Sequence, residues 1–405
     1  MHEDDGTSAG SWPDEVEFLD LGPSRRHRDV ATFRRRWPRR LPLALAGVVA
    51  AALIVAVMHT NGTPSASSTT AANSPSPEAD PPSVRGIEAE VPAVVVFDVG
   101  HPLLGGQAGW ELFARGDGDL VRIEPALGRV WRTPVPTLQS SGPVSFVVGA
   151  DQAIIRPLDY VPGYVIQDEQ PARPGPDLLG QGGPLFPGPD PRHFWAQSGD
   201  NVNAVMVLVD SDGRPTGARI PVPADSSPLR ATADGAGYLL FAGVGGVYDA
   251  RPGQLRRITT GALVAVGPAG WLTVECDSRH RCATVAVNRA NDRHHRVGPA
   301  IETNAPPGAI SPDGSTAAIF QVSRTGTATI ALLDLASGRE RPLEVSIDQQ
   351  VESGTTIVWS PDSRLLLVAD ANGRLNVVDA RTARVSSIGM PLPKLSQLAV
   401  RNLPG

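Results

Sequence analysis

Cysteine and lysine are scarce in this chain. Of its 405 residues only Cys276 and Cys282 are cysteines, so one intramolecular disulfide is the most that it can form. No cysteine stands directly after the apolar run 41–58, which excludes a lipid-modified N-terminus. Only Lys394 is a lysine among 36 basic residues, a bias that indicates a GC-rich bacterial genome rather than a function.

Several signatures of enzymes and of nucleic-acid binding are also missing. The sequence shows no Gly-rich phosphate loop, no nucleophile elbow and no paired carboxylates at a recognisable spacing, so we expect no cofactor and no catalytic residue. From residue 41 onward it carries 28 basic and 34 acidic residues. This acidic balance gives no support to nucleic-acid binding.

One uncharged apolar run predicts a membrane span. Residues 41–58 contain no charge, and as a helix the 18 residues would extend about 27 Å, just enough to cross a bilayer. Five arginines precede the run directly: Arg34, Arg35, Arg36, Arg39 and Arg40. The positive-inside rule therefore places the N-terminus in the cytoplasm and the rest outside. The alternative, a cleaved signal peptide, would need an n-region of about 40 residues.

The segments on either side of this run differ in composition. Residues 1–40 form a cytoplasmic tail, whose acidic stretch 14–21 is either a docking peptide or unstructured. Residues 59–90 are rich in Ser, Thr, Pro and Ala and cannot bury a core, so they predict a disordered tether. The remaining residues, 91–405, are expected to form one extracytoplasmic domain.

The pattern of residues 91–405 is typical of an all-β fold. Short apolar or β-branched runs alternate with Gly, Pro, Asp and Asn, and no amphipathic helix of ten or more residues is evident. Near the C-terminus, two groups of four consecutive strands with similar turns follow each other, and weaker copies precede them. Seven such units fit the length, although six or eight also fit. We therefore predict a β-propeller of seven four-stranded blades.

A repeated turn motif supports this prediction. Ser311-Pro312-Asp313-Gly314 recurs 49 residues later as Ser360-Pro361-Asp362, where Ser363 replaces the glycine. On this motif the sequence resembles the bacterial extracytoplasmic propellers with S-P-D-G repeats, the TolB-like or WD-repeat-like proteins. The resemblance is clear over residues 305–390, and it implies that the motif is a structural turn. It implies nothing about a ligand.

The two cysteines flank a short loop between two predicted strands. In a hairpin Cys276 and Cys282 come close enough to bond, and an oxidising compartment favours their disulfide. The alternative is a zinc site that adds His280 and one of His294 and His295. The five-residue spacing between the cysteines is wider than in a zinc knuckle, so we favour the disulfide.

Two groups of aromatic residues and histidines raise a further question. His193, Phe194 and Trp195 share one predicted strand, while His101 and Trp110 flank a Gly-rich loop. They would either line a ligand-binding face or fill the gaps between neighbouring sheets, and gap filling is the commoner role of aromatics in blades.

These observations favour a binding function over catalysis. We predict a membrane-anchored, extracytoplasmic propeller that acts as a non-enzymatic binding or scaffold module for a protein or an envelope polymer. The alternatives are a hydrolase or lyase with its site at the mouth of the central channel, or a receptor that signals through the cytoplasmic tail.

Overall fold

All residues that the structure describes belong to one compact unit within Ile87–Gly405. The computed structural model describes residues 94–106, 108–136, 143–158, 163–199, 203–301, 306–322, 328–347 and 356–403. The expected tail 1–40, apolar run 41–58, tether 59–90 and arginines 34–40 lie outside the described residues. Within the described ranges no helix is long and apolar enough to cross a membrane.

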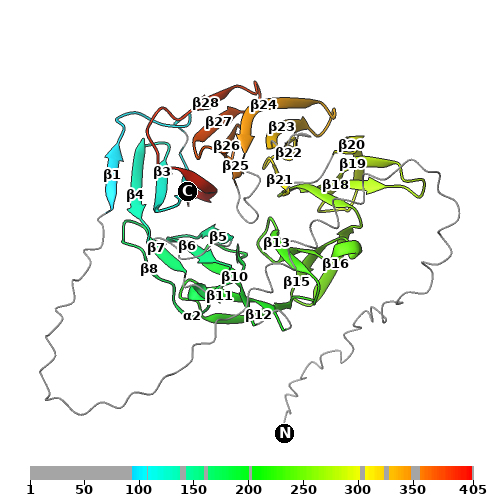
Figure 1. The fold of residues 1–405 in the computed structure, drawn as a ribbon, viewed down its shortest axis with the longest axis horizontal. Helices are drawn as coiled ribbons and strands as arrows, with labels where there is room; N and C mark the ends of the chain where they lie inside the picture. Colours follow the sequence, from blue (N-terminus) through cyan, green and yellow to red (C-terminus); the bar gives the residue numbers. More distant parts are fainter. Residues whose placement is uncertain are drawn as a thin grey trace, which may run out of the picture. The chain divides into compact units, whose positions relative to one another are not determined.

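The described residues form antiparallel sheets arranged in a ring, which makes the domain an all-β propeller (Figure 1). The first sheet has the order β1-β4-β3-β2-β29 and consists of β1 (Val95–Asp98), β2 (Trp110–Gly116), β3 (Asp119–Glu124), β4 (Arg129–Pro134) and β29 (Leu395–Asn402). The second comprises β5 (Val144–Val148), β6 (Gln152–Pro157), β7 (Tyr164–Gln167) and β8 (Arg173–Pro174). The third comprises β9 (Leu185–Pro187), β10 (His193–Ser198), β11 (Val205–Asp210) and β12 (Pro215–Pro221).

The remaining sheets continue around the ring in sequence order. The fourth consists of β13 (Ser227–Ala231), β14 (Tyr238–Phe241), β15 (Val247–Arg251) and β16 (Gln254–Thr259). An eight-stranded sheet contains β17 (Ala262–Gly267), β18 (Gly270–Cys276), β19 (Cys282–Asn288), β20 (His294–Pro299), β21 (Gly308–Ile310), β22 (Thr316–Val322), β23 (Ala328–Asp334) and β24 (Glu340–Ile347). The last consists of β25 (Ile357–Trp359), β26 (Leu365–Ala369), β27 (Leu375–Asp379) and β28 (Val385–Ser387). The described helices are the single turns α2 (Asp177–Gly180) and η2 (Gly243–Gly245).

The number of sheets differs from the predicted seven separate blades. The described strands form six hydrogen-bonded sheets, five of them with four or five strands and one with eight. The eight-stranded sheet arises because β17 and β21 pair in parallel, with Ala265 opposite Gly308 and Val266 opposite Ala309. A repeat count along the sequence misses this pairing, because it is made between strands of consecutive repeats.

Strands in the middle of a sheet are buried on both faces. In β26, Leu366, Leu367 and Val368 are completely buried. Leu366 and Val368 belong to the core shared with β22 and β23, whereas Leu367 packs in the core shared with β2 and β3. Each sheet is therefore covered by a neighbour on either side, which explains the continuous apolar runs in place of strict alternation.

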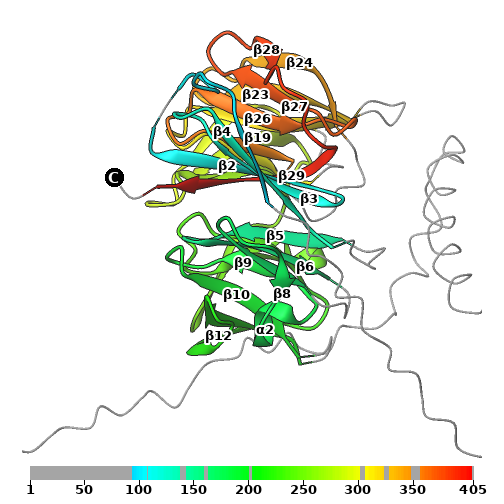
Figure 2. The ribbon, with the colours of Figure 1, turned by 90° about the vertical axis from the view of Figure 1, so that its left-hand side faces the viewer.

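The two ends of the domain meet in the first sheet. The C-terminal strand β29 pairs antiparallel with β2 along its whole length, from Trp110 opposite Asn402 to Gly116 opposite Leu395 (Figure 2). This pairing closes the ring, because it adds the end of the chain to the sheet that begins it. A closed ring leaves only short, protected inner edges, which so many short strands in open sheets would expose.

Antiparallel order fixes which turns share a face of the ring. In a four-stranded meander the first and third turns lie at the same end of the strands. We call this end the first-turn face. Between β13 and β20 it contains the turns at 232–237, 252–253, 268–269 and 289–293.

Candidate functional site

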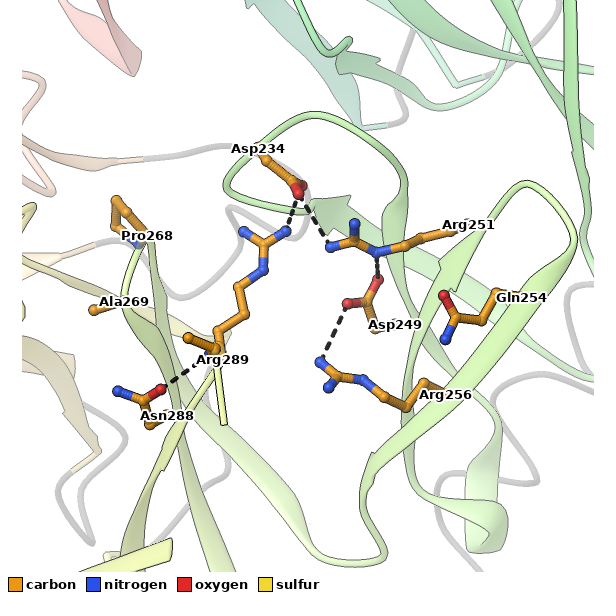
Figure 3. A pocket seen from close by; sticks show the side chains of 10 residues that line it. Asp234, Asp249, Arg251, Gln254, Arg256, Pro268, Ala269, Asn288 and Arg289 are labelled. Carbon is orange, nitrogen blue, oxygen red and sulfur yellow. Dashed lines mark hydrogen bonds and ion pairs between the residues drawn. The ribbon is translucent and has the colours of Figure 1, made fainter. Parts of the chain in front are cut away.

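A cavity of about 540 Å³ lies on the first-turn face, between the sheet β13–β16 and the strands β17–β20 (Figure 3). Seven of its ten lining residues are polar or charged, and the lining comes from the four turns and the strands beside them. The lining residues are Asp234, Asp249, Arg251, Gln254, Arg256, Pro268, Ala269, Asn288, Arg289 and Ala290.

Asp234 is held in place by the turn between β13 and β14. Its Oδ1 atom accepts hydrogen bonds from Thr232 Oγ1 at 2.8 Å and from the Ala236 N–H at 3.2 Å. Gly235 has a φ of +64°, a conformation that favours glycine. The turn therefore aims the Oδ2 atom of Asp234 into the cavity. There it meets Arg251 Nη2 at 3.2 Å and the guanidinium of Arg289.

The far wall of the cavity is built around Asp249 on β15. Its side chain is only 2% exposed, and it accepts a hydrogen bond from Arg251 Nε at 3.0 Å. Arg256 lies within 3.6 Å of the same carboxylate and also bonds both oxygens of Asp292 at 2.8 and 3.1 Å. Its guanidinium lies over the ring of Trp271, 5.2 Å from the centroid. Arg256 thus joins the two sheets at the rim.

Together these side chains form a continuous series of ion pairs around the cavity. In order they are Arg289, Asp234, Arg251, Asp249, Arg256 and Asp292. Among the lining residues three arginines face two aspartates. Three guanidinium groups carry fifteen N–H donors, far more than the contacts within the series occupy. The cavity therefore offers a surplus of hydrogen-bond donors.

Two ionisable groups of the cavity, Asp234 and Arg251, are held in their charged forms. Burial alone would raise the pKa of Asp234, but hydrogen bonds from Arg289, Thr232 and the Ala236 N–H hold it well below its usual range. Burial would lower the pKa of Arg251, yet its bonds to Asp249 and Asp234 raise it. Groups with these pKa values neither donate nor accept protons near neutral pH, so the arrangement suits binding through charge.

The predicted disulfide is confirmed. Cys276 and Cys282 face each other across the hairpin of β18 and β19, with Cα atoms 4.0 Å apart, and their sulfurs are bonded. The alternative zinc site is therefore wrong, because a disulfide has no thiolate to offer a metal. His294, one of the three histidines considered as ligands, places its Nδ1 atom 3.3 Å from Glu275 Oε2.

Both S-P-D motifs form the turn before a second strand. Ser311 Oγ donates to Asp313 Oδ1 at 2.6 Å and accepts the Thr316 N–H at 3.0 Å. Ser360 makes the same two bonds, to Asp362 Oδ1 at 2.6 Å and from the Leu365 N–H at 2.9 Å.

Pro312 and Pro361 occupy the second position of these turns, where their fixed φ is suitable. Gly314 and Ser363 take equivalent positive φ angles of +73° and +64°. The Ser363 hydroxyl also accepts the Asp313 N–H at 3.0 Å, which links the two turns.

The two groups of aromatic residues and histidines lie away from the cavity, and their aromatic side chains are buried in the packing of the sheets. Phe194 and Trp195 are each 1% exposed, and Trp195 Nε1 donates to the Gly235 carbonyl in the turn that carries Asp234. His193 lies 2.6 Å from Asp190. Trp110 is buried, and His101 contacts its neighbouring backbone at Val99. None of these residues lines the cavity.

Sequence reasoning missed the cavity residues altogether. Asp234 and Arg289 are 55 positions apart, and neither belongs to a recognised motif. The one available signal was the Thr-Ala-Asp-Gly sequence at 232–235, a turn in the same place within its unit as the S-P-D motifs.

Comparison with known proteins finds similarity only among solved structures. No family model matches the chain, and no curated protein matches it. Similar solved structures include a functionally unknown protein from Desulfotomaculum acetoxidans, at 13% identity over 73% of this chain and 99% of that one, with a TM-score of 0.48. TolB from Acinetobacter baumannii is 13% identical over 72% of this chain and 82% of its own, with a TM-score of 0.40.

TolB structures are thus among the neighbours of this chain. It is similar to TolB-like β-propellers. An oligogalacturonate lyase in complex with manganese is also similar, at 10% identity over 68% of this chain and 86% of that one, with a TM-score of 0.47. At these identities the likeness concerns the fold alone and assigns neither a ligand nor an activity.

Proposed function

We propose that this protein is a membrane-anchored, extracytoplasmic propeller that binds an envelope component without chemical change, and that the cavity on the first-turn face is its binding site. The observation that carries this proposal is the series of ion pairs from Arg289 to Asp292, which presents fixed charges in an open cavity.

The ionised form of the Asp234 carboxylate supports binding over catalysis. A general acid or base works best with a pKa near the operating pH. In this cavity Asp234 is held ionised by Arg289, and Asp249 lies between Arg251 and Arg256. A hydrolase or lyase that used Asp234 as its acid or base would need this carboxylate to exchange a proton, which its ion pair with Arg289 opposes.

The membrane anchor is proposed from the sequence alone. The uncharged residues 41–58 and the arginines before them favour a span with the N-terminus inside. A reporter active only in the cytoplasm should work when fused before residue 30, and one active only outside should work after residue 90. Replacing Arg34, Arg35, Arg36, Arg39 and Arg40 with serine should weaken this preference, and the opposite pattern of activity would overturn the orientation.

We also infer that the eight-stranded sheet acts as two blades. Its two halves, β17–β20 and β21–β24, are each a four-stranded meander, and only two residue pairs join them. Counted in this way the ring has seven units. Amides of the joining pairs should exchange with solvent faster than those inside either half, whereas equal protection would argue for one continuous sheet.

Capture from an envelope extract tests the binding function. Gln254 lines the cavity and is exposed, and Leu255 beside it is 51% exposed but does not line the cavity. We expect the immobilised full chain to retain an envelope component unchanged in mass. Gln254→Trp, which adds bulk to the cavity lining and leaves every charged residue in place, should abolish retention, and Leu255→Trp should not. Equal retention by both variants, or chemical conversion of the captured material, would contradict the proposal.

A further inference from the structure

Positive charge is concentrated next to the cavity. Residues 251–296 contain eight arginines and only three acids, a net charge of +5 in a chain whose total is -6. Three of the eight histidines lie in the same segment. The acidic average of the domain therefore hides a strongly basic region on the strands β16–β20.

Much of this charge is exposed and unpaired. Arg293, His294, His295 and Arg296 are all exposed and lie on or just before β20, the terminal strand of the eight-stranded sheet. Arg279 is exposed in the disulfide-closed hairpin between β18 and β19. Among the described residues, the side chains of Arg279, Arg293 and Arg296 have no carboxylate partner. The N–H donors of these three guanidinium groups are therefore available to an external anion.

We call Arg279, Arg293 and Arg296 the basic strip. β19, from Cys282 to Asn288, separates the hairpin from the turn that leads to Arg293. Seven strand residues extend about 20 Å, so the strip spans that length along the outer part of the ring. A single small anion would contact only one end of it.

The basic strip is continuous with the cavity. The turn between β19 and β20 supplies Asn288, Arg289 and Ala290 to the lining and then leads within three residues to Arg293. Asp292 in this turn is held by Arg256, which fixes the rim against the neighbouring sheet. A chain-like ligand that lies on the strip would therefore bring one of its ends within reach of the guanidinium N–H groups of Arg289 and Arg251.

We infer that the ligand is a linear polyanion, a polymer with repeated carboxylate or phosphate groups, which lies along the basic strip and places one anionic group in the cavity. This inference rests on the proposed binding function and names its ligand class. Arginine suits both kinds of oxyanion, because its planar N–H fork bonds two oxygens at once. The length of the strip favours a polymer over a monomer.

Binding to defined polymers tests the inference. The full chain in detergent is titrated with polygalacturonate, with polyphosphate and with neutral dextran of similar length. We expect one or both polyanions to bind, with an affinity that falls steeply as salt is raised, and dextran not to bind. The two polyanions distinguish carboxylate from phosphate chemistry.

A matched pair of variants locates the contact. The strip variant carries Arg279→Ser, Arg293→Ser and Arg296→Ser. The control carries Arg129→Ser, Arg214→Ser and Arg384→Ser, which remove the same charge from exposed positions on other sheets. The strip variant should lose more than about tenfold in affinity and show a weaker salt dependence, while the control should lose less than about twofold. Circular dichroism checks that both variants fold.

Several outcomes would overturn the inference. Equal losses in the two variants would mean that only net charge matters. Strip-dependent binding to phosphatidylglycerol vesicles or to duplex DNA, with none to either polymer, would assign the strip to a membrane surface or to nucleic acid. If neither polyanion binds but Gln254→Trp still abolishes capture from the envelope extract, the inference fails and the proposed binding function stands.

Discussion

Arg401 on the last strand bonds Glu111 on the second, with 2.7 Å between Arg401 Nε and Glu111 Oε2, across 290 positions of sequence. Both side chains are buried, at 5% and 1% exposure. Arg401 also bonds Asp168 of the next sheet at 2.7 Å and lies over the ring of Phe113. The ring is therefore closed by a buried ionic network as well as by the pairing of β29 with β2.

Removing this arginine should destabilise the domain strongly. Arg401→Met leaves Glu111 buried with Arg122 as its only cationic partner in the described structure. Loss of one partner of a buried ion pair costs about 3 kcal/mol or more. Urea unfolding should show this loss. Arg214→Gln is the control, because its pair with Asp212 is 71% and 59% exposed and should contribute less than about 1 kcal/mol. Equal effects of the two changes would contradict the closing role.

The disulfide should make a smaller, local contribution. Cys276 and Cys282 are six positions apart, and a loop this short contributes about 2 kcal/mol in the chain-entropy model. Replacing both with serine should lower the melting temperature by a few degrees, since the domain is large. Thiol titration of the denatured, unreduced protein should find no free thiol, and two thiols would refute the bond.

Acid should lower the free energy of unfolding through Asp234. Because Arg289 and its other partners depress the pKa of Asp234 in the fold, its contribution to stability is complete above the unfolded value near 4. That contribution is lost as the pH falls below this value toward the folded pKa. Wild-type protein should therefore lose more unfolding free energy between pH 6 and pH 3 than Asp234→Asn does. Parallel curves for the two proteins would show that the ion pairs add nothing.

The buried serine of the repeated turn should be required for stability. Ser360 is completely buried, and its hydroxyl both donates to Asp362 and accepts the Leu365 N–H. Ser360→Ala removes the acceptor for that amide, which should cost about 1 to 3 kcal/mol in a thermal or urea melt. Ser226→Ala, at an exposed turn, should change stability little.

Features that depend on neighbours in sequence were predictable. The S-P-D turns and the Cys276–Cys282 hairpin each close within a few residues, so spacing alone indicated them. Ring closure was not predictable in this way, because Arg401 and Glu111 lie at opposite ends of the domain. The parallel pairing of β17 and β21 likewise joins separate repeats, which is why the sheet count differed.

The cavity escaped sequence reasoning for a related reason. It combines single residues from two sheets, such as Asp234 and Arg289, whose meeting is decided by the packing of one sheet on the next. The basic strip was not recognised because the net charge was counted once for all residues from 41 to the C-terminus. A sliding count over 251–296 would have shown it.

Hydrogen exchange of the full chain tests the central claim most directly. Amide exchange is compared with and without the component retained from the envelope extract. The proposal predicts slower exchange at 234–236, 251–256 and 288–293, the backbone that builds the cavity, and no such change in Gln254→Trp. Protection elsewhere on the ring, with these segments unchanged, would show that the cavity is not the binding site.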